Sequence, residues 1–332
     1  MKQTKQLIVG SSKGGVGKTM LALYSAVAAA KRGLKVCVVD LDSYGPTHWA
    51  GLSLTQEGVQ SHLVEMRDLE SWIGYQDEPE VPPAGLDQYL YEAKVRWAEL
   101  DVTFTAVPLY PSTFVLARTN EMLSSRSGTT RVLQRLKALR EVLKKKDFDW
   151  LIVDLAPGLF IGPAQLVRDS LADRTCTFLY VSTATDADVL TSIYDLDWIF
   201  SRAYGLEQET GPIWWVFNKV PEHRCPGRPD LQELLALLRS NLWEAARVQM
   251  DLNAMGGLAR LLTTLPQDPS RIFNGRLARR VSAIPFDAEV ASAMADTTLP
   301  GQSELWKHLN TCGIPLTNAL ESLAKALFEQ EV

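Results

Sequence analysis

Short apolar runs alternate with longer amphipathic stretches along most of this chain. The apolar runs have the length of buried strands, and the amphipathic stretches repeat with the period of a helix. The predicted strands cover residues 7–10, 35–42, 102–108, 151–154, 176–183 and 212–217. The predicted helices cover residues 20–32, 86–100, 129–146, 186–203, 230–250, 252–264 and 316–331. This alternation predicts an α/β fold with a parallel sheet, right-handed crossovers and flanking helices.

A glycine-rich turn joins the first predicted strand to the first predicted helix, and it ends in Gly17-Lys18-Thr19. Glycines let backbone N–H groups turn inward, and the start of a helix adds partial positive charge, so this arrangement cradles phosphate. Lys18 can reach the β- and γ-phosphates, and the Thr19 hydroxyl can bind Mg²⁺. The alternative is a glycine-rich loop with two incidental surface lysines. The predicted nucleotide-binding residues of this stretch are Gly14, Gly15, Val16, Gly17, Lys18, Thr19 and Met20.

The loop departs from the usual G-x-x-x-x-G-K-[ST] pattern at its first position, where Ser12 replaces glycine. Lys13 directly precedes the two glycines, and Lys-Gly-Gly-x-Gly-Lys-Thr resembles the deviant Walker A loop of the MinD/ParA class of ATPases. The resemblance implies a P-loop NTPase fold that binds ATP and Mg²⁺. It also implies that Lys13 crosses a homodimer interface to contact the nucleotide of the partner subunit.

Two aspartates, Asp40 and Asp42, end the second predicted strand. Carboxylates at a strand end beside a phosphate site can hold metal and water. The Asp-x-Asp and the Gly-Pro turn that follows resemble switch I of this family, in the form seen in Mrp-type iron–sulfur carrier ATPases. The resemblance implies that Asp42 orients the attacking water and that Asp40 lies near Mg²⁺. The alternative is that one of the two carboxylates caps a turn.

The run Leu151-Ile152-Val153 ends in Asp154, as in a Walker B strand. Asp154 is therefore expected to hold a water molecule bound to Mg²⁺. The Ala-Pro-Gly that follows resembles switch II, a loop that the γ-phosphate can order.

Two later segments complete the resemblance, which spans residues 7 to about 295. Asn218 ends a strand at the position where family members read the adenine base, although asparagine at a strand end often only caps a turn. Residues 281–290 resemble the family's Ile-Pro-x-Asp-x-x-Val segment, which implies that Pro285 lies against the base and that Asp287 belongs to the nucleotide site.

Three features depart from the family. Met20 stands where relatives carry Thr or Ser, so a side-chain bond to the α-phosphate is missing. Residues 222–278 form a predicted helical insertion within a single domain of residues 1–332, and the insertion either contacts a partner or covers an apolar face. Mrp-type carriers keep a Cys-x-x-Cys pair near their C-terminus, whereas this chain has only Cys312 there, so no Fe–S cluster is expected.

Composition narrows the range of partners. The net charge of −5 gives no global attraction to nucleic acid, and a local arginine cluster at 271–280 leaves DNA binding possible but not favoured. The chain shows no secretory signal, no apolar run of about 18 residues and no disulfide framework, so a cytoplasmic location is expected. The predicted last helix carries glutamates on its polar face, which favours docking on the body over anchoring in a membrane.

These features favour a Mg²⁺-dependent ATPase, slow and stimulated by a partner, that acts as an ATP-driven dimerisation switch to position or assemble an unidentified protein partner or cargo. The alternatives are a nucleotide-bound module with little hydrolysis and a ParA-like partition ATPase that binds DNA non-specifically. Transfer of phosphate to a small molecule is a third class. Lys13 argues against it, since that lysine serves a dimer.

Overall fold

A computed structural model gives the fold of this chain. It describes residues 3–42, 53–56, 59–60, 90–97, 100–107, 125–158, 167, 170–171, 176–183, 185, 188, 191–192, 212–220, 281–295 and 314–329. The predicted insertion at 222–278, its two helices, the arginine cluster, Cys312 and most of the predicted helix at 186–203 lie outside these residues. Those predictions, and the prediction of a single domain, stay predictions.

Within the described residues the strands form one sheet in the order β10-β9-β8-β1-β7-β2-β6-β5-β3-β4. The pairs from β10 to β6 are parallel, and β5, β3 and β4 extend the sheet in antiparallel fashion. The predicted parallel α/β fold is therefore confirmed. The strands are β1 (Lys5–Gly10), β2 (Val36–Leu41), β3 (Ser53–Gln56), β4 (Val59–Gln60), β5 (Tyr91–Trp97), β6 (Leu100–Val107), β7 (Trp150–Leu155), β8 (Cys176–Thr183), β9 (Ile213–Val220) and β10 (Val281–Pro285).

β1 lies in the middle of the parallel part, between β7 and β8. Its residues from Gln6 to Gly10 are buried, as expected for a strand covered on both faces. In the register of the sheet, Asp154 on β7 lies beside Val9 on β1 and beside Asp40 on β2. The sheet therefore places the acidic ends of two strands next to the loop that follows β1. Ligands of open parallel sheets bind at such carboxyl ends.

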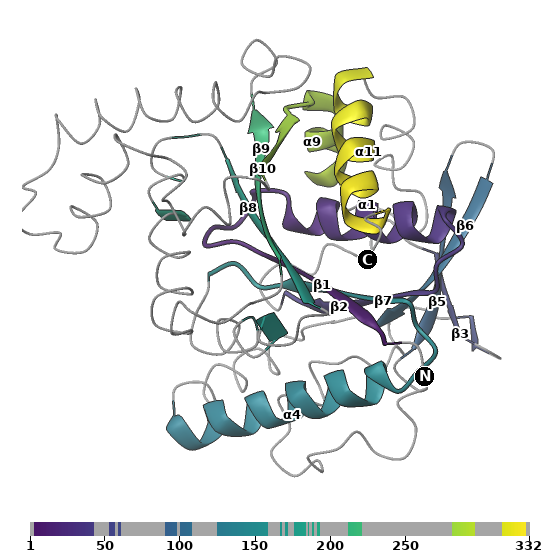
Figure 1. The fold of residues 1–332 in the computed structure, drawn as a ribbon, viewed down its shortest axis with the longest axis vertical. Helices are drawn as coiled ribbons and strands as arrows, with labels where there is room; N and C mark the ends of the chain where they lie inside the picture. The colour runs from purple at the N-terminus through teal and green to yellow at the C-terminus, as the bar shows by residue number, and fades with distance from the viewer. Residues whose placement is uncertain are drawn as a thin grey trace, which may run out of the picture.

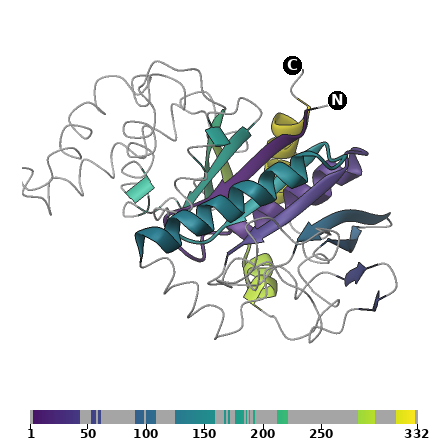
Figure 2. The same ribbon diagram turned by 90° about the horizontal axis from the view of Figure 1, so that it is seen from below.

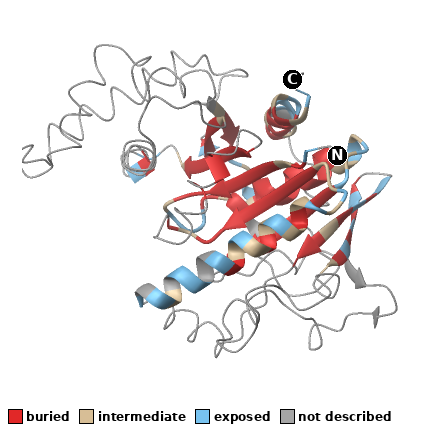
Figure 3. Ribbon diagram, turned by 60° about the horizontal axis from the view of Figure 1, so that its bottom comes forward, coloured by how far each residue is buried: buried red, intermediate tan, exposed pale blue. Residues whose placement is uncertain are grey.

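Helices cover both faces of the sheet. Figure 1 shows α4 (Arg126–Lys144) on one side and α1 (Lys18–Lys31), α9 (Ala288–Ala295) and α11 (Ile314–Phe328) on the other, and Figure 2 shows α4 running across the near face. α1 is buried along nearly its whole length, because its alanines allow close approach to the strands. Figure 3 shows the buried residues gathered in the parallel strands and in the helix sides that face them.

The helix predicted at 86–100 is wrong, because β5 occupies residues Tyr91–Trp97 and pairs with β6. The side chains of β5 alternate between buried and exposed, with Tyr91, Ala93, Val95 and Trp97 inside. Charged residues stand between them, so the true period is two. The predicted helix relied on leucine, alanine and tryptophan at a spacing near 3.6, which this segment also contains.

α11 docks on α1 and β10, as predicted for the last helix. Its apolar face is buried at Leu316, Leu320, Leu323, Ala324 and Leu327. At the rim, the Arg32 guanidinium donates to Glu321 at 2.5 Å and to Glu329 at 3.0 Å, and the Tyr24 hydroxyl also donates to Glu321. Among the described helices, none combines the length and the apolar character that crossing a membrane requires.

Replacing Leu320 with alanine tests this docking. Leu320 is almost fully buried, so Leu320→Ala is expected to lower the free energy of unfolding by about 2–5 kcal/mol, measured by urea denaturation. Asn318→Ala, on the exposed side of the same helix, is the control and should stay within about 0.5 kcal/mol of wild type. Equal stability of the two variants contradicts the docking.

Candidate functional site

The loop between β1 and α1 depends on a glycine with left-handed backbone geometry. Gly17 precedes the first residue of α1 and has φ +94°. A Cβ at this position would lie 2.1 Å from Nδ2 of Asn218. Two constraints therefore require glycine at position 17: the positive φ, and the lack of room for a Cβ beside Asn218. The serine that replaces the first glycine of the pattern, Ser12, is hydrogen-bonded to the Tyr180 hydroxyl of β8 at 2.6 Å.

The end of β9 holds this loop in place. Nδ2 of Asn218 donates to the carbonyl oxygen of Val16 at 2.8 Å, and Nζ of Lys219 donates to that of Gly15 at 2.7 Å. Lys219 has φ +58°, which is unusual for a residue with a side chain and signals a constrained position. Two carbonyl groups thus turn toward β9.

Two buried polar pairs lie at the start of α1. Nζ of Lys18 is 3.7 Å from Oδ2 of Asp42, and the Thr19 hydroxyl donates to Oδ2 of Asp154 at 2.8 Å. All four side chains are buried. Asp40, also buried, accepts the backbone N–H of Asp42 on Oδ1 at 2.8 Å. This bond is the turn cap that the sequence left open as the alternative for Asp40.

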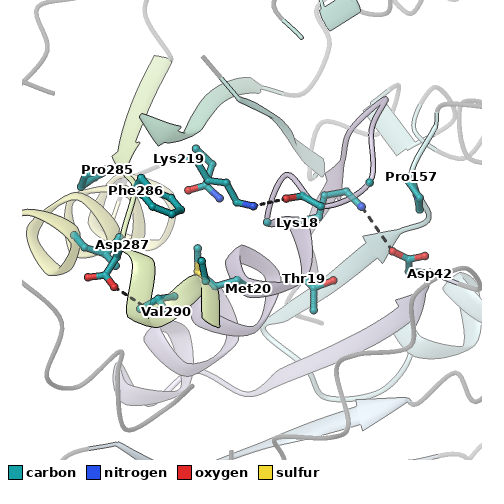
Figure 4. Close-up of a pocket in the computed structure, with 16 residues that line it drawn as sticks. Lys18, Thr19, Met20, Asp42, Pro157, Lys219, Pro285, Phe286, Asp287 and Val290 are labelled. Carbon is teal, nitrogen blue, oxygen red and sulfur yellow. Dashed lines mark hydrogen bonds and ion pairs between the residues drawn. The ribbon is translucent and has the colours of Figure 1, made fainter. Parts of the chain in front are cut away.

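A cavity of about 430 Å³ opens beside these pairs. Figure 4 shows Asp42 and Pro157 at one end of it, Phe286 and Asp287 at the other end, and Met20 and Thr19 along the start of α1. One end is charged and polar, and the other end is largely apolar. The dimensions and the chemistry suit an elongated ligand with an anionic part and an apolar part.

Most of the predicted site residues meet at this cavity. The predicted residues that line it are Gly14, Gly15, Gly17, Lys18, Thr19, Met20, Asp42, Asn218, Pro285 and Asp287. Four others do not line it: Lys13, Val16, Asp40 and Asp154. Of these, Val16, Asp40 and Asp154 bond to residues that do. The roles assigned to all of these residues stay predictions.

Asp287 has a structural task as well. Its Oδ1 accepts the backbone N–H groups of Glu289 and Val290, each at 3.0 Å, so it caps the start of α9. The cap fixes the angle at which α9 leaves Pro285 and holds this end of the cavity in shape.

Lys13 does not line the cavity and pairs with Asp188. Its Nζ lies 2.9 Å from Oδ1 of Asp188, and the lysine side chain is 63% exposed while that of the aspartate is 8% exposed. Burial alone would raise the pKa of Asp188, but the hydrogen bonds from Thr183 and Lys13 together outweigh it and leave that pKa below its ordinary value. Asp188 therefore stays ionised at neutral pH and holds Lys13 within its own chain.

Six residues that line the cavity were not among the predicted site residues: Pro157, Lys219, Phe286, Val290, Ala291 and Leu316. Of these, Lys219 and Phe286 are each the neighbour of a predicted site residue. Lys219 directly follows Asn218, and Phe286 stands between Pro285 and Asp287. Their positions in the sequence were the available signal, but the inward reach of Lys219 depends on its backbone angle.

The donors near Thr19 fit Mg²⁺. A threonine hydroxyl and an aspartate carboxylate are oxygen ligands of the kind that Mg²⁺ prefers, and here they lie 2.8 Å apart at the start of α1. Within the described residues, no group of three or more His, Cys, Asp or Glu side chains forms a metal cage. A magnesium ion held here would therefore rely on water and on phosphate oxygens, which is its common mode of binding.

Comparison with known proteins gives a family match and one curated relative. Residues 4–167 match the family model of an AAA domain. An iron–sulfur cluster carrier protein of Synechocystis sp. is 30% identical, over 32% of this chain and 35% of that protein. The chain thus aligns with about a third of the length of this relative.

Solved structures match over almost the whole chain. The cell division ATPase MinD of Pyrococcus furiosus has a TM-score of 0.55 at 15% identity, with 100% of both chains covered. The pNOB8 ParA bound to nonspecific DNA has a TM-score of 0.54 at 13% identity, with 98% of each covered. MinD of Pyrococcus horikoshii OT3 in complex with Mg-ADP has a TM-score of 0.52 at 15% identity, over 98% of this chain and 96% of that one. The fold predicted from the loop and strand motifs is confirmed.

Gly17→Ala tests the loop geometry. The added methyl group displaces Asn218 or the loop, and losing one buried hydrogen bond costs about 1–3 kcal/mol, so affinity for MgATP should fall by about tenfold or more. Gly33→Ala is the matched control, since Gly33 also has positive φ but a Cβ there meets nothing within 4 Å. It should cost only about 1–2 kcal/mol of stability and leave binding unchanged, measured by calorimetric titration and urea denaturation.

Proposed function

We propose that this chain is a P-loop NTPase of the MinD/ParA type and that it is a Mg²⁺-dependent ATPase in which ATP drives the pairing of two subunits. The observation that carries the proposal is the convergence of the glycine loop, Lys18, Thr19 and Asp42 on one cavity with an apolar far end. An anionic chain attached to a flat organic group fits such a cavity. The Mg-ADP bound to a MinD of the same fold supports this ligand class.

The residues of the charged end divide the work of binding and hydrolysis. Lys18 and the N–H groups at the start of α1 bind the phosphates. Thr19 and Asp154 would hold Mg²⁺, which when bound neutralises negative charge on the phosphates. The carboxylate of Asp42 lies 3.7 Å from Nζ of Lys18. When Lys18 binds the phosphates, this carboxylate is therefore near the reacting phosphate group, where it can orient a water molecule.

Lys13 supplies the link between the nucleotide and the dimer. It is the more exposed of the two lysines of the loop, and among the described residues its ammonium group pairs with Asp188. In the proposed dimer Lys13 leaves Asp188 and approaches the nucleotide of the partner subunit. The paired state would then position or assemble an unidentified protein partner or cargo, from a cytoplasmic location.

Two other functions for the same fold have some support. The pNOB8 ParA of the same fold was solved with nonspecific DNA, which supports a DNA-binding partition ATPase as an alternative. The Synechocystis relative is an iron–sulfur carrier, which supports a test for bound iron. The described cysteines, Cys37 and Cys176, are buried, and burial raises the pKa of the Cys37 thiol, so neither suits a cluster.

Asp42→Asn tests hydrolysis. The variant should keep its affinity for MgATP, because Lys18 loses a competing carboxylate, while turnover falls by about 10²–10⁴-fold with the loss of water activation. Asp101→Asn, at an exposed site on β6, is the control and should hydrolyse like wild type. Equal, near-zero turnover of wild type and Asp42→Asn with all partners present favours a nucleotide-bound module instead.

Lys13→Ala tests the dimer. Light scattering should show the wild-type mass double with MgATP and stay that of one chain without nucleotide. Lys13→Ala should remain a single chain and hydrolyse slowly, whereas the exposed Lys35→Ala should behave like wild type. A wild-type mass that does not change with MgATP contradicts the dimer, and normal hydrolysis by Lys13→Ala contradicts the crossing role.

A further inference from the structure

Ser11 lies directly after β1 and is fully buried, and it is not among the predicted site residues. Its backbone carbonyl accepts the N–H of Gly158 at 2.9 Å, and its hydroxyl donates to the backbone carbonyl of Lys13 at 2.7 Å. One residue thus bonds both to the segment that follows β7 and to the first lysine of the glycine loop. Breaking either bond would leave a polar group of a buried residue without its partner, which is costly. The two segments are therefore expected to move together.

The segment that follows β7 borders the charged end of the cavity. Pro157 lines this end together with Asp42, as Figure 4 shows. A Cβ added to Gly14 would lie 3.9 Å from the side chain of Pro157, so this segment and the glycine loop lie close together here. The terminal phosphate of a nucleotide held at this end would therefore lie beside Pro157. The next residue, Gly158, carries the N–H that bonds to Ser11.

Asp188 holds the other end of Lys13. The lysine Nζ lies 2.9 Å from Oδ1 of Asp188, and the buried carboxylate also accepts the Thr183 hydroxyl. The backbone of Asp188 is fixed as well, since its N–H donates to the Thr185 hydroxyl at 3.4 Å and its carbonyl accepts the Ser192 hydroxyl at 2.5 Å. These bonds keep Asp188 in place when the glycine loop shifts. A shift of the Lys13 backbone therefore weakens the ion pair, because the carboxylate does not follow.

We propose that Ser11 is a positioning residue that couples the segment after β7 to Lys13, so that a terminal phosphate beside Pro157 draws Lys13 off Asp188 and frees it for the partner subunit. The inference rests on the proposed function, because it describes how the state of the nucleotide reaches the residue that contacts the partner. A diphosphate lacks the terminal group and leaves Lys13 on Asp188. Two opposing controls thus act on one lysine: Ser11 transmits its release and Asp188 resists it.

Ser11→Ala tests the coupling on the full chain. The variant loses the hydroxyl that bonds to Lys13, whereas Lys18 and the N–H groups at the start of α1 are unchanged. Its affinity for MgATP, measured by calorimetric titration, should stay within about threefold of wild type. The dissociation constant of its dimer with MgATP, measured by light scattering, should rise by about 5–150-fold, the usual range of a coupling between two sites. Ser25→Ala removes another buried hydroxyl, on α1, and should pair like wild type.

Asp188→Asn should act in the opposite direction. It keeps the shape of the side chain and removes the charge that retains Lys13. An ion pair with one exposed partner contributes about 2–5-fold, and a symmetric dimer contains two such lysines, so the dissociation constant of the dimer should fall by about 4–25-fold. Asp101→Asn, at an exposed site, is the control and should leave it unchanged.

Two double variants separate positioning from structural damage. Ser11→Ala with Asp188→Asn should pair more tightly than Ser11→Ala alone, since the contact that resists release is gone. A loop that Ser11→Ala had merely damaged would not be rescued in this way. Lys13→Ala with Asp188→Asn should remain a single chain, because Asp188 is proposed to act through Lys13. If this double variant pairs like Asp188→Asn, the inference is overturned.

The remaining outcomes separate the inference from the proposed function. If wild type pairs with MgATP and Ser11→Ala pairs equally well, the coupling role fails and the dimer proposal stands. If Ser11→Ala loses affinity for MgATP together with pairing, Ser11 shapes the phosphate site itself and the coupling role fails. If wild type does not pair with MgATP, the proposed function fails and the inference fails with it. Circular dichroism of each variant checks that folding is retained.

Discussion

The site depends on the hydrogen bonds that side chains at the end of β9 donate to carbonyl groups of the glycine loop. The loop has to turn its N–H groups toward the ligand, so its carbonyl groups must find donors on the other side. Asn218 and Lys219 supply those donors, to Val16 and Gly15. The bond to Val16 is buried, and a buried carbonyl group left without a donor would be costly, whereas the bond to Gly15 is exposed to solvent. Together the two bonds keep the loop in the shape that receives phosphate.

The position of β1 in the sheet explains why these residues meet at all. β8 and β9 lie on one side of β1, and β7 and β2 lie on the other. β9 brings Asn218 and Lys219 to the loop, while β7 and β2 bring Asp154 and Asp42 to the start of α1. Segments about 200 residues apart in the chain thus act on one loop, because the strands that carry these residues are parallel and end at the same edge.

Much of this arrangement could be predicted from the sequence, because its signals are local. A glycine turn before a helix, or an aspartate after an apolar run, has the same physical meaning wherever it occurs, and the predicted strands, the parallel sheet and the docked last helix followed from such patterns. β5 could not be assigned, because its alternation of Tyr91, Ala93, Val95 and Trp97 coexists with an apolar spacing near that of a helix. Antiparallel pairing with β6 decides between the two, and pairing is not local.

Lys219 and Lys13 show another limit of prediction from the sequence. The reach of Lys219 depends on a positive φ, and the position of Lys13 depends on a carboxylate 175 residues away.

The pair between Lys13 and Asp188 has a consequence for the effect of salt on the proposed dimer. When Lys13 moves to a partner's nucleotide, one contact between opposite charges is exchanged for another. Added electrolyte screens both contacts, so at this residue the two effects partly cancel. The contribution of Lys13 to the stability of the proposed dimer should therefore depend less on ionic strength than the number of charges at the contact suggests.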